Sequence, residues 1–330
     1  MTSKFKYEKL TPMLRHYVDI KNDFKDSLLL YRVGDFYETF FDDAIITAKV
    51  LSLTLTGKEC GHEDRAPMCG VPQHVIDTYV NRLVKKGHKV ALCDQIEDPK
   101  EAKGLVKRAI TRVITPGTLT DIESLENKEN NYLLSIFENE YGLAMAYCDI
   151  STGKLVCLEI KALSQSIGKK AIDQIEKINP SEIVLNTDFS NQDIKKYLNL
   201  NNQIFVNYIN FTSDFDNRIK NIYDYLGKEN LNKIKDKRLM IIALSNLLDY
   251  IYKYYEERLD HINNIEILKI NEYMEIEANT RKNLELTRNL NSNTKENSLI
   301  NILDQADTVM GSRMIHEWLE RPLIDKEKIN

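Results

Sequence analysis

The sequence has little of what marks disulfide-rich or membrane-spanning chains. Its 330 residues include five cysteines, an odd number without any Cys-x-x-Cys pair, which favours reduced thiols over a disulfide framework. The longest apolar runs, such as residues 239–244, are far shorter than the ~20 residues that a transmembrane helix needs. No apolar segment follows the first lysines, so no signal peptide is predicted. We therefore expect a cytoplasmic protein without a membrane partner.

A loop for nucleotide phosphates is also missing. No Gly-x-x-x-x-Gly-Lys-[Ser/Thr] motif occurs, because Gly57-Lys58 and Gly227-Lys228 lack both the upstream glycine and the hydroxyl residue that should follow. We expect no cofactor on this chain and no enzymatic activity from it.

A zinc site is the next possibility to test. Its candidate ligands are Cys60, His62, Cys69 and His74, but their spacing fits none of the common zinc patterns. Buried thiols beside ordinary loop histidines are the simpler interpretation, and we expect no metal.

Charge is distributed unevenly along the chain. The formal net charge is −5, which argues against a uniformly basic nucleic-acid protein. The stretch from residue 81 to residue 117, however, has nine Lys or Arg and only four Asp or Glu. Such a patch can hold phosphates within an acidic chain, although a patch of this kind alone is more often a solvated face.

The first part of the chain mixes strands and helices. At 330 residues, about two or three domains are expected. Apolar periodicity and capping signals predict helices at residues 12–24 and 36–53 and strands at 27–33, 89–94 and 112–114. The pattern predicts a small mixed α/β domain over residues 1–120, followed by a polar linker over residues 121–131.

The rest of the chain is predicted to form a second α/β domain and then helices. Three short strands joined by hairpins precede alternating helices and strands, which indicates a three-layer α/β domain over residues 132–235 that resembles the ribonuclease H architecture. Residues 236–330 are predicted to be an all-α segment. This segment is short compared with most domains, so we expect it to be the start of a helical domain. The elements expected in this part are strands at 132–137, 143–150, 154–160, 181–185 and 203–208 and helices at 167–178, 192–198, 239–259, 298–303 and 308–319.

The segment from Gly34 to Glu38 lies on a predicted strand-to-helix turn. Phe36 at the first helical position would be exposed beside free backbone N–H groups, which suit a phosphate backbone. Apolar wedges in the minor groove unstack bases, and unstacking costs less at a mispair. A difference of roughly 1–2 kcal/mol would give a preference of about 5- to 30-fold. The alternatives are purely structural roles, in which Asp35 and Glu38 form a capping box and Phe36 belongs to the core.

Ordered motifs along the whole chain carry a family resemblance. They are Gly34-Asp-Phe-Tyr-Glu38, Arg65-Ala-Pro-Met-Cys-Gly-Val-Pro-Gln-His74, residues 87–99, residues 104–108, residues 112–118, Asp149-Ile-Ser-Thr-Gly153, residues 280–286, residues 308–313 and residues 318–323. In their order and spacing they resemble the MutS family of mismatch-repair proteins, and the first resembles its mismatch-reading Phe-x-Glu motif. Two small departures, Gln73 in place of an aromatic and Asp94 in place of Glu, bear on local packing.

The resemblance implies roles for individual residues and partners. Phe36 would stack at the mispair and Glu38 would hydrogen-bond the displaced base of a mismatched DNA duplex. The second domain would be the connector, which contacts MutL-type repair proteins. ATP, magnesium and the homodimer would belong to intact family members, whose ATPase lies further along. Candidates for DNA-backbone contacts are Lys103, Lys107, Arg108 and Arg112.

Two other functions compete with DNA recognition. A two-metal nuclease needs converging carboxylates; Asp149 is on a suitable strand, but Glu182 is a poor partner for it. A protein-interaction module with little DNA specificity could instead dock through the tyrosines at 250, 252, 254 and 255. A tyrosine stripe at helical spacing is more often core.

Overall fold

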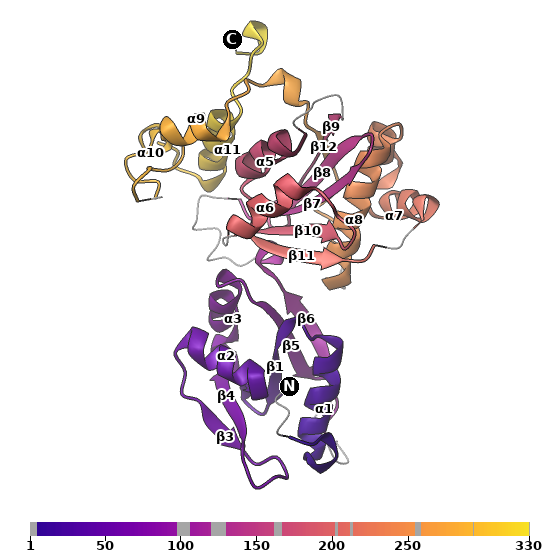
Figure 1. The fold of residues 1–330 in the computed structure, drawn as a ribbon, viewed down its shortest axis with the longest axis vertical. Helices are drawn as coiled ribbons and strands as arrows, with labels where there is room; N and C mark the ends of the chain where they lie inside the picture. Colours follow the sequence, from indigo (N-terminus) through magenta and orange to yellow (C-terminus); the bar gives the residue numbers. More distant parts are fainter. Residues whose placement is uncertain are drawn as a thin grey trace. The chain divides into compact units, whose positions relative to one another are not determined.

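The computed structural model describes residues 5–97, 106–119, 130–161, 167–201, 204–211, 214–254, 259–292 and 294–329. The chain divides into two compact units, one of Met1–Leu119 with Tyr254–Glu256 and one of Thr120–Lys253 with Glu257–Asn330 (Figure 1). Among the described residues, no helix is long and apolar enough to span a membrane.

The first unit is built on a six-stranded mixed sheet with the strand order β3-β4-β2-β1-β5-β6. Only β1 and β5 run parallel, and the other neighbours are antiparallel. In chain order, its elements are η1 (Tyr7–Lys9), α1 (Pro12–Asp23), β1 (Ser27–Val33), β2 (Phe36–Phe40), α2 (Phe41–Leu51), β3 (Thr56–Lys58), β4 (Ala66–Pro72), η2 (Gln73–Val75), α3 (Ile76–Lys85), β5 (Lys89–Gln95), β6 (Arg108–Ile114) and η3 (Pro116–Thr118).

Both faces of this sheet are covered, α1 lying on one and α3 on the other (Figure 1). Side chains alternate along a strand, so Leu29 and Tyr31 of β1 pack beside Tyr17 of α1. Leu28 and Leu30 pack on the α3 side. A strand buried on both faces has a continuous apolar run rather than an alternating one, which is why residues 27–33 were predictable from sequence.

The second unit has its own six-stranded sheet, with the order β11-β10-β7-β8-β9-β12. The first three strands form two antiparallel hairpins, and β10 and β11 add in parallel beside β7. Counted from β7, the first five strands have the order 3-2-1-4-5, which is a mixed sheet as expected for this α/β domain. The six strands of this sheet are β7 (Tyr132–Asn139), β8 (Gly142–Asp149), β9 (Lys154–Lys161), β10 (Glu182–Asn186), β11 (Phe205–Ile209) and β12 (Ile265–Ile267).

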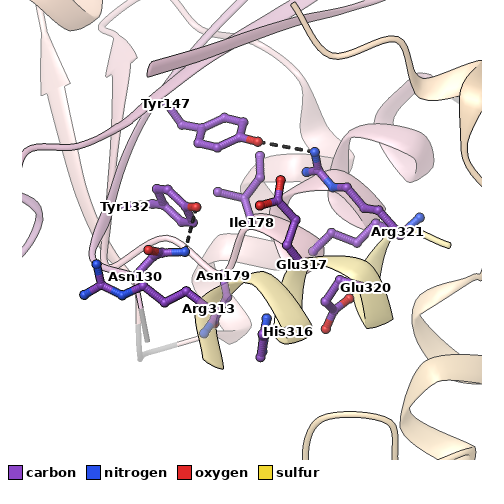
Figure 2. Close-up of a pocket in the computed structure, with 11 residues that line it drawn as sticks. Asn130, Tyr132, Tyr147, Ile178, Asn179, Arg313, His316, Glu317, Glu320 and Arg321 are labelled. Carbon is purple, nitrogen blue, oxygen red and sulfur yellow. Dashed lines mark hydrogen bonds between the residues drawn. The ribbon is translucent and has the colours of Figure 1, made fainter. Parts of the chain in front are cut away.

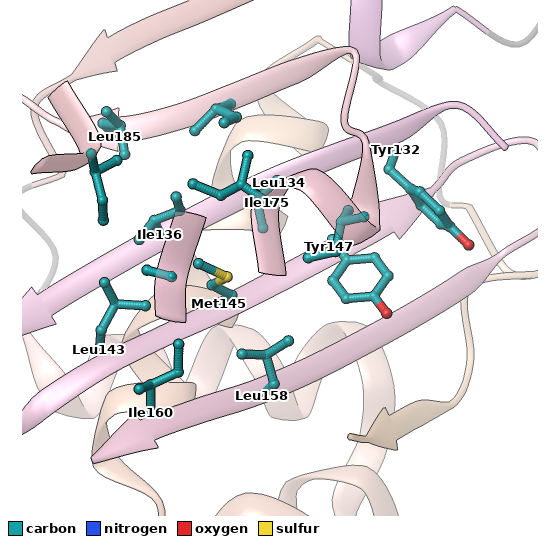
Figure 3. Close-up of a cluster of buried hydrophobic side chains, with 14 of the residues drawn as sticks. Tyr132, Leu134, Ile136, Leu143, Met145, Tyr147, Leu158, Ile160, Ile175 and Leu185 are labelled. Carbon is teal, nitrogen blue, oxygen red and sulfur yellow. The ribbon is translucent and has the colours of Figure 1, made fainter. Parts of the chain in front are cut away.

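Helices cover this second sheet on two sides. Figure 3 shows the apolar cluster on one face, in which Met145 and Leu158 of the sheet pack with Ile175 of α5 (Ile167–Ile178), and α6 (Gln192–Leu200) adds Leu198. On the other face, the buried Tyr250 of α8 (Arg238–Tyr254) donates its hydroxyl to Glu182 of β10. The domain is therefore a three-layer α/β structure.

Several elements of the second unit were not expected from the sequence, and two of them change its architecture. Helix α7 (Phe215–Ile234) is interrupted at Gly227, whose φ of 78° breaks the helical periodicity. Strand β12 pairs with β9, so this sheet extends past residue 235. The remaining elements are η4 (Ile270–Glu272), α9 (Ala278–Asn283), α10 (Leu299–Leu303), α11 (Val309–Glu320) and α12 (Lys326–Ile329).

Candidate nucleic-acid interface

The Phe36 motif lies on a strand, so the prediction of a helix from residue 36 was wrong. β2 starts at Phe36 and α2 begins only at Phe41. Glu38 pairs with Tyr31 on one side and with Gly70 on the other, so tertiary hydrogen bonding overrides the local helical pattern. The capping box and the helix-dipole argument for this segment therefore do not hold.

Phe36 is exposed at one end of the first sheet. It follows the turn at Gly34, whose φ of 57° lies in the left-handed region that glycine adopts most readily. Phe36 pairs with Val33 of β1 and with Pro72 of β4, yet it remains 49% exposed. The alternative that Phe36 is a core aromatic is thereby excluded.

Glu38 lies two residues further along β2, on the same face of the sheet as Phe36. One carboxylate oxygen, Oε2, is 2.9 Å from Nζ of Lys58, and the side chain of Glu38 is only 13% exposed. The close neighbour on β4 is Gly70, where an added Cβ would lie 3.4 Å from Cγ of Glu38. Lys58 and the backbone at Gly70 thus hold Glu38 in place, and Phe36 lies at the exposed end of the same strand.

Tyr37 lies on the opposite face of β2 and connects this strand to β5, on the other side of β1. Its hydroxyl donates to Asp94 of β5, and Thr111 of β6 donates to the same carboxylate. Burial and the Asp94 hydrogen bond raise the pKa of Tyr37 to about 12. Asp94 is therefore accommodated by direct hydrogen bonds across the sheet. Tyr37 was not singled out from the sequence, because two adjacent aromatic residues show no alternation of apolar and polar side chains.

The basic candidates have different surroundings. Lys107 is 77% exposed, and its Nζ is 3.9 Å from Oε2 of Glu97. Arg108 opens β6 opposite Gln95, at the same end of the sheet as Phe36. Lys103 lies outside the described residues.

Arg112 lies away from this end of the sheet. It pairs with Leu92, and its Nη2 is 2.7 Å from Oδ1 of Asp77 on α3. Both side chains of that ion pair are more than half exposed. Of the four basic candidates, the structure therefore places Lys107 and Arg108 near Phe36 and Arg112 on the α3 face.

The residues considered for metal chemistry have structural contacts. Asp149 is fully buried and accepts hydrogen bonds from the backbone N–H of Ser151 at 3.0 Å and its hydroxyl at 2.6 Å. All five cysteines are buried and free. Within the described ranges, no group of three or more His, Cys, Asp or Glu side chains is arranged to hold a metal ion.

A small cavity in the second unit is lined by polar side chains. Tyr132, Tyr147, Arg313, Glu317 and Arg321 face it, and Nη1 of Arg321 donates to the hydroxyl of Tyr147 at 3.3 Å (Figure 2). Its volume is about 50 Å³. A cavity needs roughly 10–15 Å³ of volume accessible to the centre of a water molecule to hold one, so this cavity has room for water.

Comparison with known proteins accounts for the whole pattern of motifs. MutS domain I matches residues 11–123, MutS domain II matches residues 131–263 and MutS domain III matches residues 279–330. The chain belongs to the MutS family. It is 44% identical to the DNA mismatch repair protein MutS of Alkaliphilus oremlandii and 45% identical to that of Clostridioides difficile. These alignments cover 98% and 97% of this chain but 37% and 33% of the relatives.

The MutS domains coincide with features of the fold. Domain I corresponds to the sheet that presents Phe36 and Glu38, and domain II contains the first five strands of the second sheet. Helices α10, α11 and α12, together with all of α9 but its first residue, lie within the stretch that matches domain III. The chain spans about a third of the length of its MutS relatives.

Proposed function

We propose that this chain recognises and binds mismatched or unpaired bases in duplex DNA as part of DNA mismatch repair. Phe36 acts as the wedge and Glu38 as the carboxylate that hydrogen-bonds the displaced base. The observation that carries the proposal is the half-exposed phenyl ring at the end of an inner strand whose other side chains are mostly buried. A ring in this position meets water in the free protein and is available to a base step.

The spacing of the two side chains suits neighbouring base levels. Residues i and i+2 of a strand lie on one face, roughly 7 Å apart. Stacked base pairs are about 3.4 Å apart. A ring inserted at one step therefore leaves the carboxylate within one or two base-pair levels of it.

A DNA-backbone contact comes from an exposed lysine at the same end of the sheet. Lys107 suits this role because its ammonium is in solvent and its contact with Glu97 is long at 3.9 Å. We extend the proposal to Lys103. Contact with a MutL-type repair protein is proposed for the second domain, whereas ATP and magnesium chemistry is proposed only for the longer MutS proteins.

The proposal is tested by fluorescence anisotropy of labelled duplexes at low, stated salt. One duplex is fully paired, and the others contain a G·T pair or one unpaired base. The chain should bind the defective duplexes about 5- to 30-fold more tightly, as a difference of roughly 1–2 kcal/mol in unstacking cost requires. Equal affinities would refute mismatch recognition by this chain. An affinity that does not change with salt concentration would indicate a protein-interaction module, because phosphate contacts make the affinity fall as salt rises.

A second prediction concerns Glu38. We expect Glu38→Gln to bind the fully paired duplex about threefold more tightly, because a carboxylate near phosphates is repelled and its amide is not. The preference for the defective duplex should fall correspondingly. The same anisotropy assay measures both effects, with Glu59→Gln as a charge-matched control. Unchanged affinity for paired DNA would mean that Glu38 does not approach the duplex.

A further inference from the structure

Arg108 differs from Lys107 and Arg112 in that its guanidinium donates to backbone carbonyl oxygens of the protein and not to an exposed carboxylate. Its Nε donates to the carbonyl oxygen of Arg32 at 2.8 Å, and its Nη1 donates to the carbonyl oxygen of Val106 at 2.7 Å. The guanidinium carbon also lies 4.8 Å from the centroid of the Tyr31 ring. The side chain is therefore fixed on three sides.

These contacts lead directly to the turn that carries Phe36. Arg32 is next to the last residue of β1, and its own Nε donates to the carbonyl oxygen of Gly34. Its guanidinium carbon also lies 5.5 Å from the centroid of the Tyr37 ring. Arg108 of β6 thus reaches past β5 to the end of β1, and Arg32 continues the connection to the turn and to β2.

Besides this connection, the turn is fixed where Phe36 pairs with Val33 of β1 and with Pro72 of β4. A Cβ built on Gly34 meets no atom within 4 Å, so open space surrounds this point of the chain. The backbone hydrogen bond from Gln73 to Asp35, at 2.9 Å, ties the other side of the turn. The Arg108–Arg32 connection therefore adds side-chain contacts to the backbone hydrogen bonds that hold the turn at Gly34 and Asp35.

We infer that Arg108 is a positioning residue that sets the orientation of the Phe36 turn, and that it does not act as a phosphate contact. This inference rests on the proposed function, in which Phe36 meets the DNA. Arginine is suited to the role because its planar fork donates in fixed directions while its face stacks on an aromatic ring. Lysine keeps the charge but has neither property.

The two roles predict different results for Arg108→Lys and Arg108→Ala in the full chain. If Arg108 positions the turn, both variants lose most of the preference for the defective duplex, at least threefold, and the slope of log affinity against log salt stays unchanged. If Arg108 binds phosphate, Arg108→Lys keeps the preference and Arg108→Ala makes the slope shallower by about one. That second pattern would overturn the inference.

Two other variants calibrate this measurement. Lys107 is an exposed candidate for phosphate contact, so Lys107→Ala should weaken binding to both duplexes alike. It should also make the slope of log affinity against log salt shallower. Lys85→Ala removes one charge from the end of α3, far along the sheet from Phe36, and should change neither quantity.

A readout without DNA separates the inference from the proposed function. Nδ1 of His16 lies 2.9 Å from the hydroxyl of Tyr31, and burial together with the charge of Arg108 lowers the pKa of His16. In Arg108→Ala, NMR titration should show this pKa raised, and amide exchange should be faster at residues 33–36. In Arg108→Lys, exchange should also be faster.

Each outcome of the DNA-free measurement decides the matter. Unchanged exchange in both variants would overturn the inference even if the wild type prefers mispaired DNA. Faster exchange in both would support it even if the wild type shows no preference, and the proposed function alone would then fail.

Discussion

Phe36→Ala should bind paired and mispaired duplexes with nearly equal affinity. The ring is 49% exposed, so little core packing is lost on truncation. What is lost is the group that gains from entering a step where stacking is already weak. We expect a preference of about 5- to 30-fold to fall to within twofold, mainly by weaker binding to the defective duplex. Anisotropy titrations of wild type and variant side by side measure the change.

The matched control for this experiment is Ile45→Ala. Ile45 is an exposed apolar residue of α2, at 45%, and lies away from the Phe36 end of the sheet. It should leave the preference intact. If Phe36→Ala still favoured the mispaired duplex as strongly as wild type, the wedge would have to be a different residue.

The largest effect on stability is expected from Asp43→Ala. Asp43 is only 5% exposed, and its Oδ2 accepts from the hydroxyl of Tyr17 and from the backbone N–H of Leu29, each at 3.0 Å. Its Oδ1 is 2.9 Å from Nζ of Lys21. Removal of this carboxylate takes the side-chain acceptor from the buried N–H of Leu29 and the charged partner from Lys21, and loss of one partner of a buried ion pair costs about 3–5 kcal/mol. The free energy of unfolding should fall by this amount.

Urea unfolding followed by circular dichroism measures the loss, and amide exchange at Leu29 assigns it to the first unit. Asp43→Asn keeps one acceptor and should cost less than alanine. Asp23→Ala, at the exposed end of α1, should stay within about 0.5 kcal/mol of wild type. An Asp43→Ala variant as stable as Asp23→Ala would show that the network contributes nothing net.

Much of the secondary structure could be predicted from local patterns. The helix at Ile167–Ile178 has the residue bounds that the sequence predicted, because its apolar side chains recur with helical spacing. The start of α2 was misplaced because Phe36–Phe40 has aromatic residues on both faces, without the polar alternation of a half-buried strand. Only its pairing with β1 and β4 identifies it as a strand. Strand β12 is three residues long and is defined by a partner more than a hundred residues earlier.

The candidate site shows the same division between local and tertiary information. Phe36 and Glu38 could be singled out as candidates from the sequence, but the different surroundings of Arg108 and Arg112 could not be predicted. Residues four apart on a regular strand share a face. The register between β5 and β6 shifts between Leu92 and Cys93, and such an irregularity re-aims the side chains beyond it. Arg108 therefore stacks on Tyr31, while Arg112 reaches Asp77 on the opposite face.

The strand that carries Phe36 has a mechanical consequence. β2 is an inner strand, hydrogen-bonded to β4 on one side and to β1 on the other. A force on the exposed ring is therefore passed into backbone ladders on both sides and not into a loop. Phe36 is therefore held stiffly, and when its ring presses against a softer partner, the partner deforms first. If that partner is a base step, the work of insertion reports the compliance of the DNA and not that of the protein.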